Sequence, residues 1–201
     1  MKIELFFIGK TNKKYLNEGI SIYEQRLKHY VPLVIKEIPE PKLKTGNAIK
    51  IKELEGEAIL RAMSKSDYII LLDEKGEHFS STGFAKHMQS IMNRGTRNLA
   101  FVVGGAYGFS EAVYKKAHAR LSLSKMTYSH QLIRLVFLEQ LYRCMTILRN
   151  EPYHNDYEYL LLKESSLYSE KKLIFTILSQ FNEIIKIHIR NNNSVSFRHL
   201  C

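Results

Sequence analysis

Three short segments combine glycine with polar and aromatic residues, a composition suited to loops that wrap a small ligand. They are residues 72–76 (Leu-Asp-Glu-Lys-Gly), 104–108 (Gly-Gly-Ala-Tyr-Gly) and 123–128 (Leu-Ser-Lys-Met-Thr-Tyr). Glycine lets the backbone approach a ligand closely and adopt a positive φ. Each segment follows an apolar stretch, and ligands of open α/β sheets bind at the carboxyl ends of strands. The three segments are therefore expected to wall one pocket, although glycine-rich turns also serve simple chain reversal.

The spacing of the glycines argues against the common nucleotide-phosphate sites. Residues 104–108 lack the G-x-G-x-x-G fingerprint of dinucleotide-binding folds, and they follow the fourth apolar strand rather than the first. No Gly-Lys-Ser/Thr follows, so the segment is not a P-loop. A nicotinamide-dependent oxidoreductase or a nucleotide-phosphate enzyme is thereby disfavoured.

Around these segments, strand and helix signals alternate along the chain. Residues 67–73 and 98–103 are apolar on both faces, as buried parallel strands are. This alternation predicts an α/β fold with a mostly parallel sheet flanked by helices. The expected strands are 2–8, 31–38, 67–73, 98–103 and 119–123. Four expected helices are 12–30, 48–64, 110–117 and 130–149. A further helix is expected to be capped within 80–82 and to run through Met92.

The composition of the 201 residues indicates a soluble protein, and its basic charge leaves both a nucleic-acid-binding protein and a basic enzyme of another kind open. Hydrophobic residues make up 45%, and the net charge of +10 favours contact with phosphate backbones. No stretch is long and apolar enough for a membrane span or a signal peptide. The cysteines, Cys144 and Cys201, fit neither a disulfide framework nor a zinc site, so we expect a cytoplasmic protein without a metal.

The chain changes character after residue 156, which divides it into two expected parts. Residues 1–156 form the α/β domain and hold most of the basic excess, because residues 157–201 carry only 6 basic and 4 acidic residues. The second part lacks glycine and proline and reads as a partly helical appendage.

Seven short stretches, in this order and spacing, give the chain a specific resemblance to a known family. They are 8–10 (Ile-Gly-Lys), 23–27 (Tyr-Glu-Gln-Arg-Leu), 72–76, 101–105 (Phe-Val-Val-Gly-Gly), 121–134, 139–143 (Glu-Gln-Leu-Tyr-Arg) and 152–154 (Pro-Tyr-His). With these stretches the chain resembles the RlmH family of SPOUT-class methyltransferases, which modify large-subunit ribosomal RNA. The match covers residues 1 to about 155, and the segment at 121–134 is its strongest part.

The resemblance implies the reaction, the cofactor and the assembly. Family members transfer a methyl group from S-adenosylmethionine to N3 of a pseudouridine, act as homodimers, and hold the cofactor in a C-terminal trefoil knot. Assembled ribosomes are the implied substrate. Carried over by motif, the cofactor-binding positions are Leu72, Gly104, Leu123, Ser124, Lys125, Met126, Thr127 and Tyr128.

Methylating an imide nitrogen calls for a base or a cation beside the cofactor, since the nitrogen is a weak nucleophile until its proton leaves. The catalytic candidates are His130, Arg134, Tyr153 and His154, and the RNA-binding candidates are Arg134, Arg143, Tyr153 and His154. A plain structural role remains open for His130. Arg143 has the alternative of an ion pair with Glu139 one helical turn earlier.

Two further patterns concern surfaces. Leu132, Leu135, Val136, Leu138, Leu141 and Met145 form an aliphatic stripe that is expected to be core or dimer interface. Glu53, Glu55 and Glu57 are expected to form a solvated helix face.

The chain also departs from the family pattern. Members of the family often have a basic residue directly after the Tyr-His pair, where this chain has Asn155, and they end there. Two rival functions therefore stay open: a ribosome- or RNA-binding protein with little activity because of the extension, and a SPOUT methyltransferase that acts on another RNA.

Overall fold

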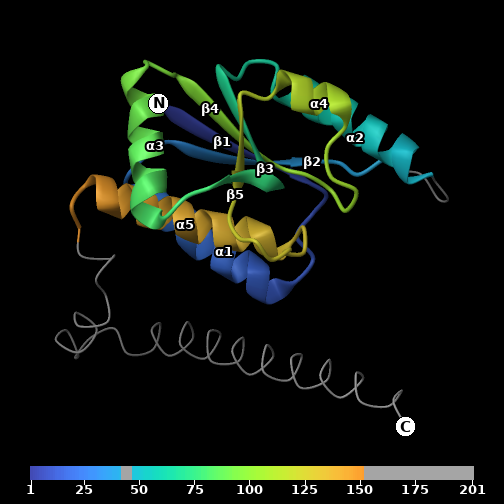
Figure 1. Ribbon diagram of the computed structural model, residues 1–201. Helices are drawn as coiled ribbons and strands as arrows, with labels where there is room; N and C mark the ends of the chain where they lie inside the picture. The colour runs from blue at the N-terminus through green and yellow to red at the C-terminus, as the bar shows by residue number, and fades with distance from the viewer. Residues whose placement is uncertain (42–46, 152–201) are drawn as a thin grey trace, which may run out of the picture. The chain divides into compact units, whose positions relative to one another are not determined.

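The computed structural model describes residues 1–41 and 47–151, which form alternating strands and helices (Figure 1). The predicted domain boundary at 156, the appendage 157–201, and the candidates Tyr153 and His154 lie outside the described residues. In chain order the elements are β1 (Lys2–Ile8), α1 (Lys14–Leu27), β2 (Leu33–Ile38), α2 (Ala48–Ala62), β3 (Tyr68–His78), α3 (Ser81–Asn93), β4 (Asn98–Val103), α4 (Glu111–Lys116), β5 (Ala119–Ser122) and α5 (Leu132–Leu148).

The strands form a five-stranded sheet in the order β2-β1-β4-β3-β5, and every neighbouring pair is parallel. Helices α1, α3 and α5 pack on one face, and α2 and α4 lie on the other (Figure 1). The predicted α/β class is therefore confirmed. Because all strands run the same way, β3, β4 and β5 bring their carboxyl ends to one edge of the sheet.

Strand β1 illustrates why the sheet is buried on both sides. Ile3, Leu5 and Phe7 pack into the cluster beneath α1, α3 and α5, whereas Phe6 and Ile8 pack into the cluster beneath α2 and α4. Successive strand residues point to opposite faces, so a strand covered on both faces must be apolar at nearly every position. Helices α1 and α5 approach closely, because a Cβ added to Gly19 would lie 2.9 Å from the methyl carbons of Leu135.

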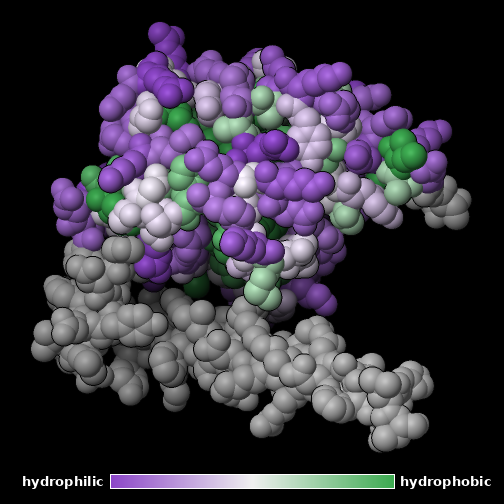
Figure 2. Space-filling model, in the orientation of Figure 1, coloured by the Kyte–Doolittle hydropathy of each residue, from purple (hydrophilic) through white to green (hydrophobic). Residues whose placement is uncertain are grey.

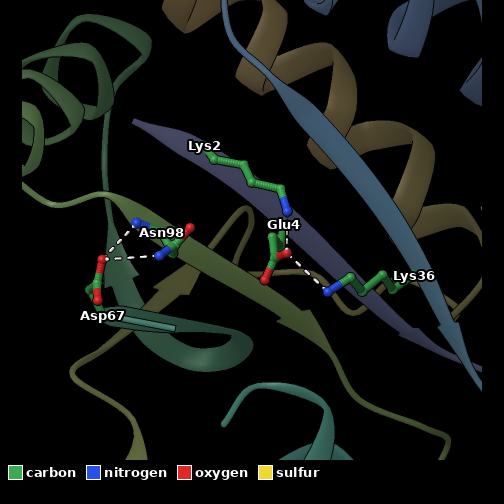
Figure 3. A network of polar contacts seen from close by, with 5 residues as sticks. All are labelled: Lys2, Glu4, Lys36, Asp67 and Asn98. Atoms are coloured by element: carbon green, nitrogen blue, oxygen red, sulfur yellow. Dashed lines mark hydrogen bonds and ion pairs between the residues drawn. The ribbon is translucent and has the colours of Figure 1, made fainter. Parts of the chain in front are cut away.

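Polar groups fasten the opposite, amino-terminal edge of the sheet (Figure 3). Glu4 Oε1 accepts hydrogen bonds from Lys2 Nζ at 2.8 Å and Lys36 Nζ at 2.9 Å. Burial opposes ionisation of Glu4, but the two lysines outweigh it and lower the pKa of the carboxyl. Asp67 Oδ2 accepts from the backbone N–H groups of Asn98 at 2.8 Å and Arg97 at 3.1 Å. The first pair of contacts ties β1 to β2, and the second ties the start of β3 to the start of β4.

Local sequence also sets where helices begin. Ser80 caps α3, since its Oγ accepts a hydrogen bond from the N–H of Gly83 at 3.0 Å, as predicted for residues 80–82. Asn47 caps α2 through the N–H of Ile49. The observed helices are a few residues shorter at their ends than the hydrophobic periodicity predicts.

One expected loop belongs to a strand instead. Residues 72–76 were predicted to leave a strand that ends at Asp73, but β3 continues to His78. Leu72 and Glu77 both pair with Leu121 of β5, so the residues between them form a bulge, named here the β3 bulge (73–76). Gly76 permits the bulge, because a Cβ there would lie 2.6 Å from backbone atoms of Leu121.

The face of the molecule in Figure 2 is mainly hydrophilic, and no helix within 1–41 and 47–151 is long and apolar enough to cross a membrane.

Candidate active site

A pocket of about 630 Å³ opens at the carboxyl ends of β3, β4 and β5. The three segments singled out from sequence all line it: the end of β3 with its bulge, residues 103–109, and most of residues 121–130. This volume is in the range of cofactor-sized sites. The predicted cofactor-binding residues that line the pocket are Leu72, Gly104, Leu123, Ser124, Met126, Thr127 and Tyr128, with His130 beside them, whereas Lys125 is exposed and does not line it.

The glycine turn (104–108) forms one wall of the pocket. Gly105 and Gly108 pair as an isolated antiparallel bridge, and the N–H of Gly108 donates to the carbonyl of Gly105 at 3.2 Å. Gly108 has φ +73°, a conformation that L side chains rarely adopt. A Cβ on Gly104 would lie 3.2 Å from the ring of Phe109. The glycines therefore allow a tight turn that presents backbone rather than side chains to the pocket.

The opposite wall, residues 122–131, is held by its own serines. Ser122 Oγ donates to the carbonyl of Ser124 at 2.9 Å, and Ser124 Oγ accepts from the N–H of Met126 at 2.9 Å. Ser129 Oγ accepts from the N–H of Leu132 at 3.2 Å, where α5 begins. These short-range hydrogen bonds fix the backbone of residues 122–131. The N–H and C=O groups of this backbone are expected to recognise the adenine ring of the cofactor.

Arg134 has a different environment from the one expected of a residue that contacts RNA. Its side chain is 0% exposed and does not line the pocket. It donates to the carbonyls of Ile8, Gly9 and His130 and to Thr11 Oγ1, and its guanidinium lies 4.7 Å from the ring centre of Phe7. Burial lowers its pKa, while the charges of Glu37 and Glu40 oppose that shift. With all these partners inside the protein, we interpret Arg134 as a positioning residue. Its catalytic and RNA-binding roles stay predictions.

Arg143 takes the alternative that its spacing allowed. Its Nη2 lies 2.7 Å from Glu139 Oε1, and its Nε donates to the same oxygen at 3.1 Å. The pair is one turn apart on α5 and partly exposed. Contact of Arg143 with RNA stays a prediction.

The expectation of a solvated acidic face on α2 is wrong for Glu55. Glu53 and Glu57 are exposed, but Glu55 is only 6% exposed, and its Oε2 has no hydrogen-bond partner among residues 1–41 and 47–151. Burial, reinforced by the charge of Glu40, raises the pKa of this carboxyl. It lies against the glycine turn, since a Cβ on Gly105 would be 2.5 Å from Glu55 Oε2. Residues two apart on a helix point in nearly opposite directions, so the three glutamates cannot share one face.

Two polar wall residues were not singled out from sequence. Lys52 of α2 and Tyr114 of α4 both line the pocket, and the Tyr114 hydroxyl donates to Asp73 Oδ2. Nothing in the pattern around these residues distinguishes them from ordinary helix positions, because only the packing of α2 and α4 against the strand ends brings them to the site. Among the described residues, no three His, Cys, Asp or Glu side chains gather as metal ligands would.

Comparison with known proteins assigns this architecture to a family. A family model described as "Predicted SPOUT methyltransferase" matches residues 1–154. The chain belongs to the SPOUT methyltransferases. Within this family it is 53% identical over 157 residues to ribosomal RNA large subunit methyltransferase H of Parabacteroides distasonis, with 78% of this chain and 100% of the relative covered. It is 50% identical over 155 residues to the protein of the same name from Cytophaga hutchinsonii, covering 77% and 100%.

The match places this SPOUT methyltransferase in the RlmH group, as the sequence motifs predicted. A putative methyltransferase of Legionella pneumophila, solved with bound S-adenosylmethionine, aligns with a TM-score of 0.42 at 10% identity, over 74% of this chain and 66% of that one. The match covers the whole of the Parabacteroides relative but 78% of this chain, so the remainder of this SPOUT methyltransferase has no counterpart in that relative.

Proposed function

We propose that this protein transfers a methyl group from S-adenosylmethionine to N3 of a pseudouridine in large-subunit ribosomal RNA. The observation that carries the proposal is the single pocket walled by the β3 bulge, the glycine turn and residues 121–130. Relatives that are about half identical over the whole of their length are named ribosomal RNA large subunit methyltransferase H, which supports the ribosomal RNA substrate. The proposed substrate, an assembled ribosome, puts the reaction in the cytoplasm.

The residues of the pocket suit the proposed cofactor. Leu72, Val103, Leu121 and Leu123 supply apolar walls for an adenine ring, and the turns supply backbone hydrogen-bonding groups. S-adenosylmethionine carries a positive sulfonium and a positive ammonium against one carboxylate. The carboxylate of Glu74 offers negative charge to these groups. The proposed cofactor contacts are Leu72, Gly104 and residues 123–128, held in the trefoil knot that the family resemblance implies.

The chain's part in the reaction is alignment and handling of the proton. The cofactor brings an activated methyl group, so the protein must hold the nucleophile in line with it and keep water out. His130 lines the pocket at the start of α5, where it is able to take the N3 proton or to stabilise the developing anion. We propose Tyr153 and His154 as contacts on the RNA side. A partner subunit would cover the half-exposed part of the aliphatic stripe, Leu132, Leu135 and Val136.

The decisive experiment measures transfer of labelled methyl from S-adenosylmethionine to unmodified ribosomes, with naked ribosomal RNA and transfer RNA in parallel. Label on ribosomes that maps to a pseudouridine supports the whole proposal. Label on transfer RNA alone points to a SPOUT methyltransferase with another substrate. Ribosome binding without label on any RNA leaves an RNA-binding protein, and a chain ending at Asp156 then tests whether the extension blocks turnover.

His154→Ala tests the RNA-side assignment separately. Loss of methyl transfer with cofactor affinity unchanged is the expected result. Turnover equal to that of the wild type would remove His154 from the proposal.

A further inference from the structure

The carboxylate of Asp73 is held at the pocket wall by an arrangement that the proposed reaction leaves unused. The β3 bulge begins directly after Leu72 and turns residues 73–76 out of the sheet pairing. Bulges beside active sites re-aim side chains in this way. Asp73 lines the pocket and is half-buried, whereas its neighbour Glu74 is exposed.

Both oxygens of Asp73 are fixed by donors from the protein. Oδ1 accepts from the N–H of Lys75 at 2.7 Å, and Oδ2 accepts from the hydroxyl of Tyr114. The Tyr114 ring packs edge-on against Phe109, with the Arg120 guanidinium 5.8 Å from its centre. Burial, together with the bond to Asp73, raises the pKa of Tyr114 to about 12, so the hydroxyl remains a donor at neutral pH. The carboxylate is therefore pre-oriented before any ligand arrives.

We propose that Asp73, positioned by Tyr114, binds the vicinal hydroxyls of the cofactor's ribose. This inference rests on the proposed cofactor site and names a contact for it beyond the motif residues. An ionised carboxylate has about two acceptor positions on each oxygen. The contacts to Lys75 and Tyr114 use one position on each oxygen, which leaves one position per oxygen for two adjacent donors.

A pair of neighbouring hydroxyls matches the two remaining acceptor positions of Asp73 better than the other hydrogen-bond donors of the cofactor do. The adenine amino group is a single donor on a flat ring and suits the backbone carbonyls of the apolar walls. The ammonium group of the methionine part is strongly hydrated and suits the exposed Glu74 at the pocket mouth. The ribose lies between these two parts of the cofactor, as Asp73 lies between Leu72 and Glu74 in the wall.

The test is a comparison of ligands rather than of activities. Calorimetric titration of the full chain uses S-adenosylhomocysteine, its 2′-deoxy and 3′-deoxy analogues, and an analogue without the amino group. The wild type should lose about 10- to 100-fold in affinity for each deoxy analogue, the size of a charge-assisted hydrogen bond. Asp73→Asn should bind S-adenosylhomocysteine at least about 10-fold more weakly and should discriminate against the deoxy analogues by less than about threefold.

The neighbouring Glu74→Gln is the matched control, and its ratio of affinities for the parent and deoxy ligands should equal that of the wild type. Tyr114→Phe keeps the ring but removes the hydroxyl that positions Asp73, so its ratio of affinities for the parent and deoxy ligands should lie between those of the wild type and Asp73→Asn. If Asp73→Asn does not fold, Tyr114→Phe replaces it in the comparison. An unchanged ratio in Asp73→Asn overturns the inference. The inference is also overturned if Asp73→Asn instead binds S-adenosylhomocysteine and its analogue without the amino group equally well, because Asp73 then binds the ammonium group. If the wild type binds no S-adenosylhomocysteine, the proposed function itself fails.

Discussion

The guanidinium of Arg134 donates a 3.0 Å hydrogen bond to the carbonyl of Gly9, which lies 125 positions earlier in the chain. The same side chain bonds to the carbonyl of His130, whose side chain lines the pocket. Arg134 therefore joins the carboxyl end of β1 to the start of α5 and to the loop that forms one wall of the site. A buried cation in this place holds the pocket wall in position relative to β1.

Arg134→Lys should lower the free energy of unfolding by about 2–4 kcal/mol, because a lysine cannot reach all four acceptors and the remaining buried groups lose their partners. Urea denaturation measures the change. Arg61→Lys is the control, since Arg61 is 73% exposed and pairs only at 3.6 Å with Glu57; it should change stability by less than about 0.5 kcal/mol. Equal effects of the two substitutions would contradict the structural role of Arg134.

Glu55→Gln should make the protein more stable at neutral pH. The raised pKa of Glu55 means that the folded state binds the proton more tightly than the unfolded state, whose carboxyl has the ordinary value of 4.5. Stability of the wild type therefore falls as pH rises above 4.5, up to the folded pKa. The advantage of Glu55→Gln should be small at pH 4 and grow to on the order of 1–3 kcal/mol at pH 7. Glu57→Gln, exposed on the same helix, should show no such growth in urea denaturation across this range.

Gly105→Ala should weaken cofactor binding, because the added methyl group would clash with the Glu55 side chain on the side of the glycine turn that faces α2. The new Cβ would lie 2.5 Å from Glu55 Oε2, so either the buried Glu55 carboxyl or the glycine turn must shift. We expect about a 10-fold loss of affinity for S-adenosylhomocysteine. The double variant Gly105→Ala/Glu55→Ala should recover most of it, because the obstructing atoms are those of a side chain. A double variant that binds as weakly as Gly105→Ala alone would locate the strain elsewhere.

The sequence predicted the sheet well because a strand buried on both faces leaves a strong local signal. Residues 2–8 and 98–103 were predicted with the observed bounds, since apolar residues occupy nearly every position of both strands. The pair of Glu139 and Arg143 was also predictable as an alternative, because residues four apart on a helix are neighbours.

Other features depend on contacts that no local pattern contains. The partners of Arg134 lie up to 126 positions away, so no local pattern could reveal its hydrogen bond to the carbonyl of Ile8. Glu55 was misassigned because the sequence shows three alternating glutamates, of which only Glu53 and Glu57 are solvated. Helical geometry turns Glu55 to the opposite, inward side. The β3 bulge needs the pairing of Leu72 and Glu77 with one residue of β5, which is visible only in the sheet.

His130→Ala should separate chemistry from cofactor binding. His130 lines the pocket next to the segment expected to hold the cofactor, and its hydrogen bond to Arg134 uses only its backbone carbonyl, which alanine keeps. Removing the imidazole should lower methyl transfer to ribosomes by about 100-fold, the usual contribution of a general base. Affinity for S-adenosylhomocysteine should stay within about twofold. His29→Ala, an exposed histidine outside the pocket, should transfer methyl at the wild-type rate. If His130→Ala transferred methyl as fast as His29→Ala, the proton would have to be handled by a group other than His130.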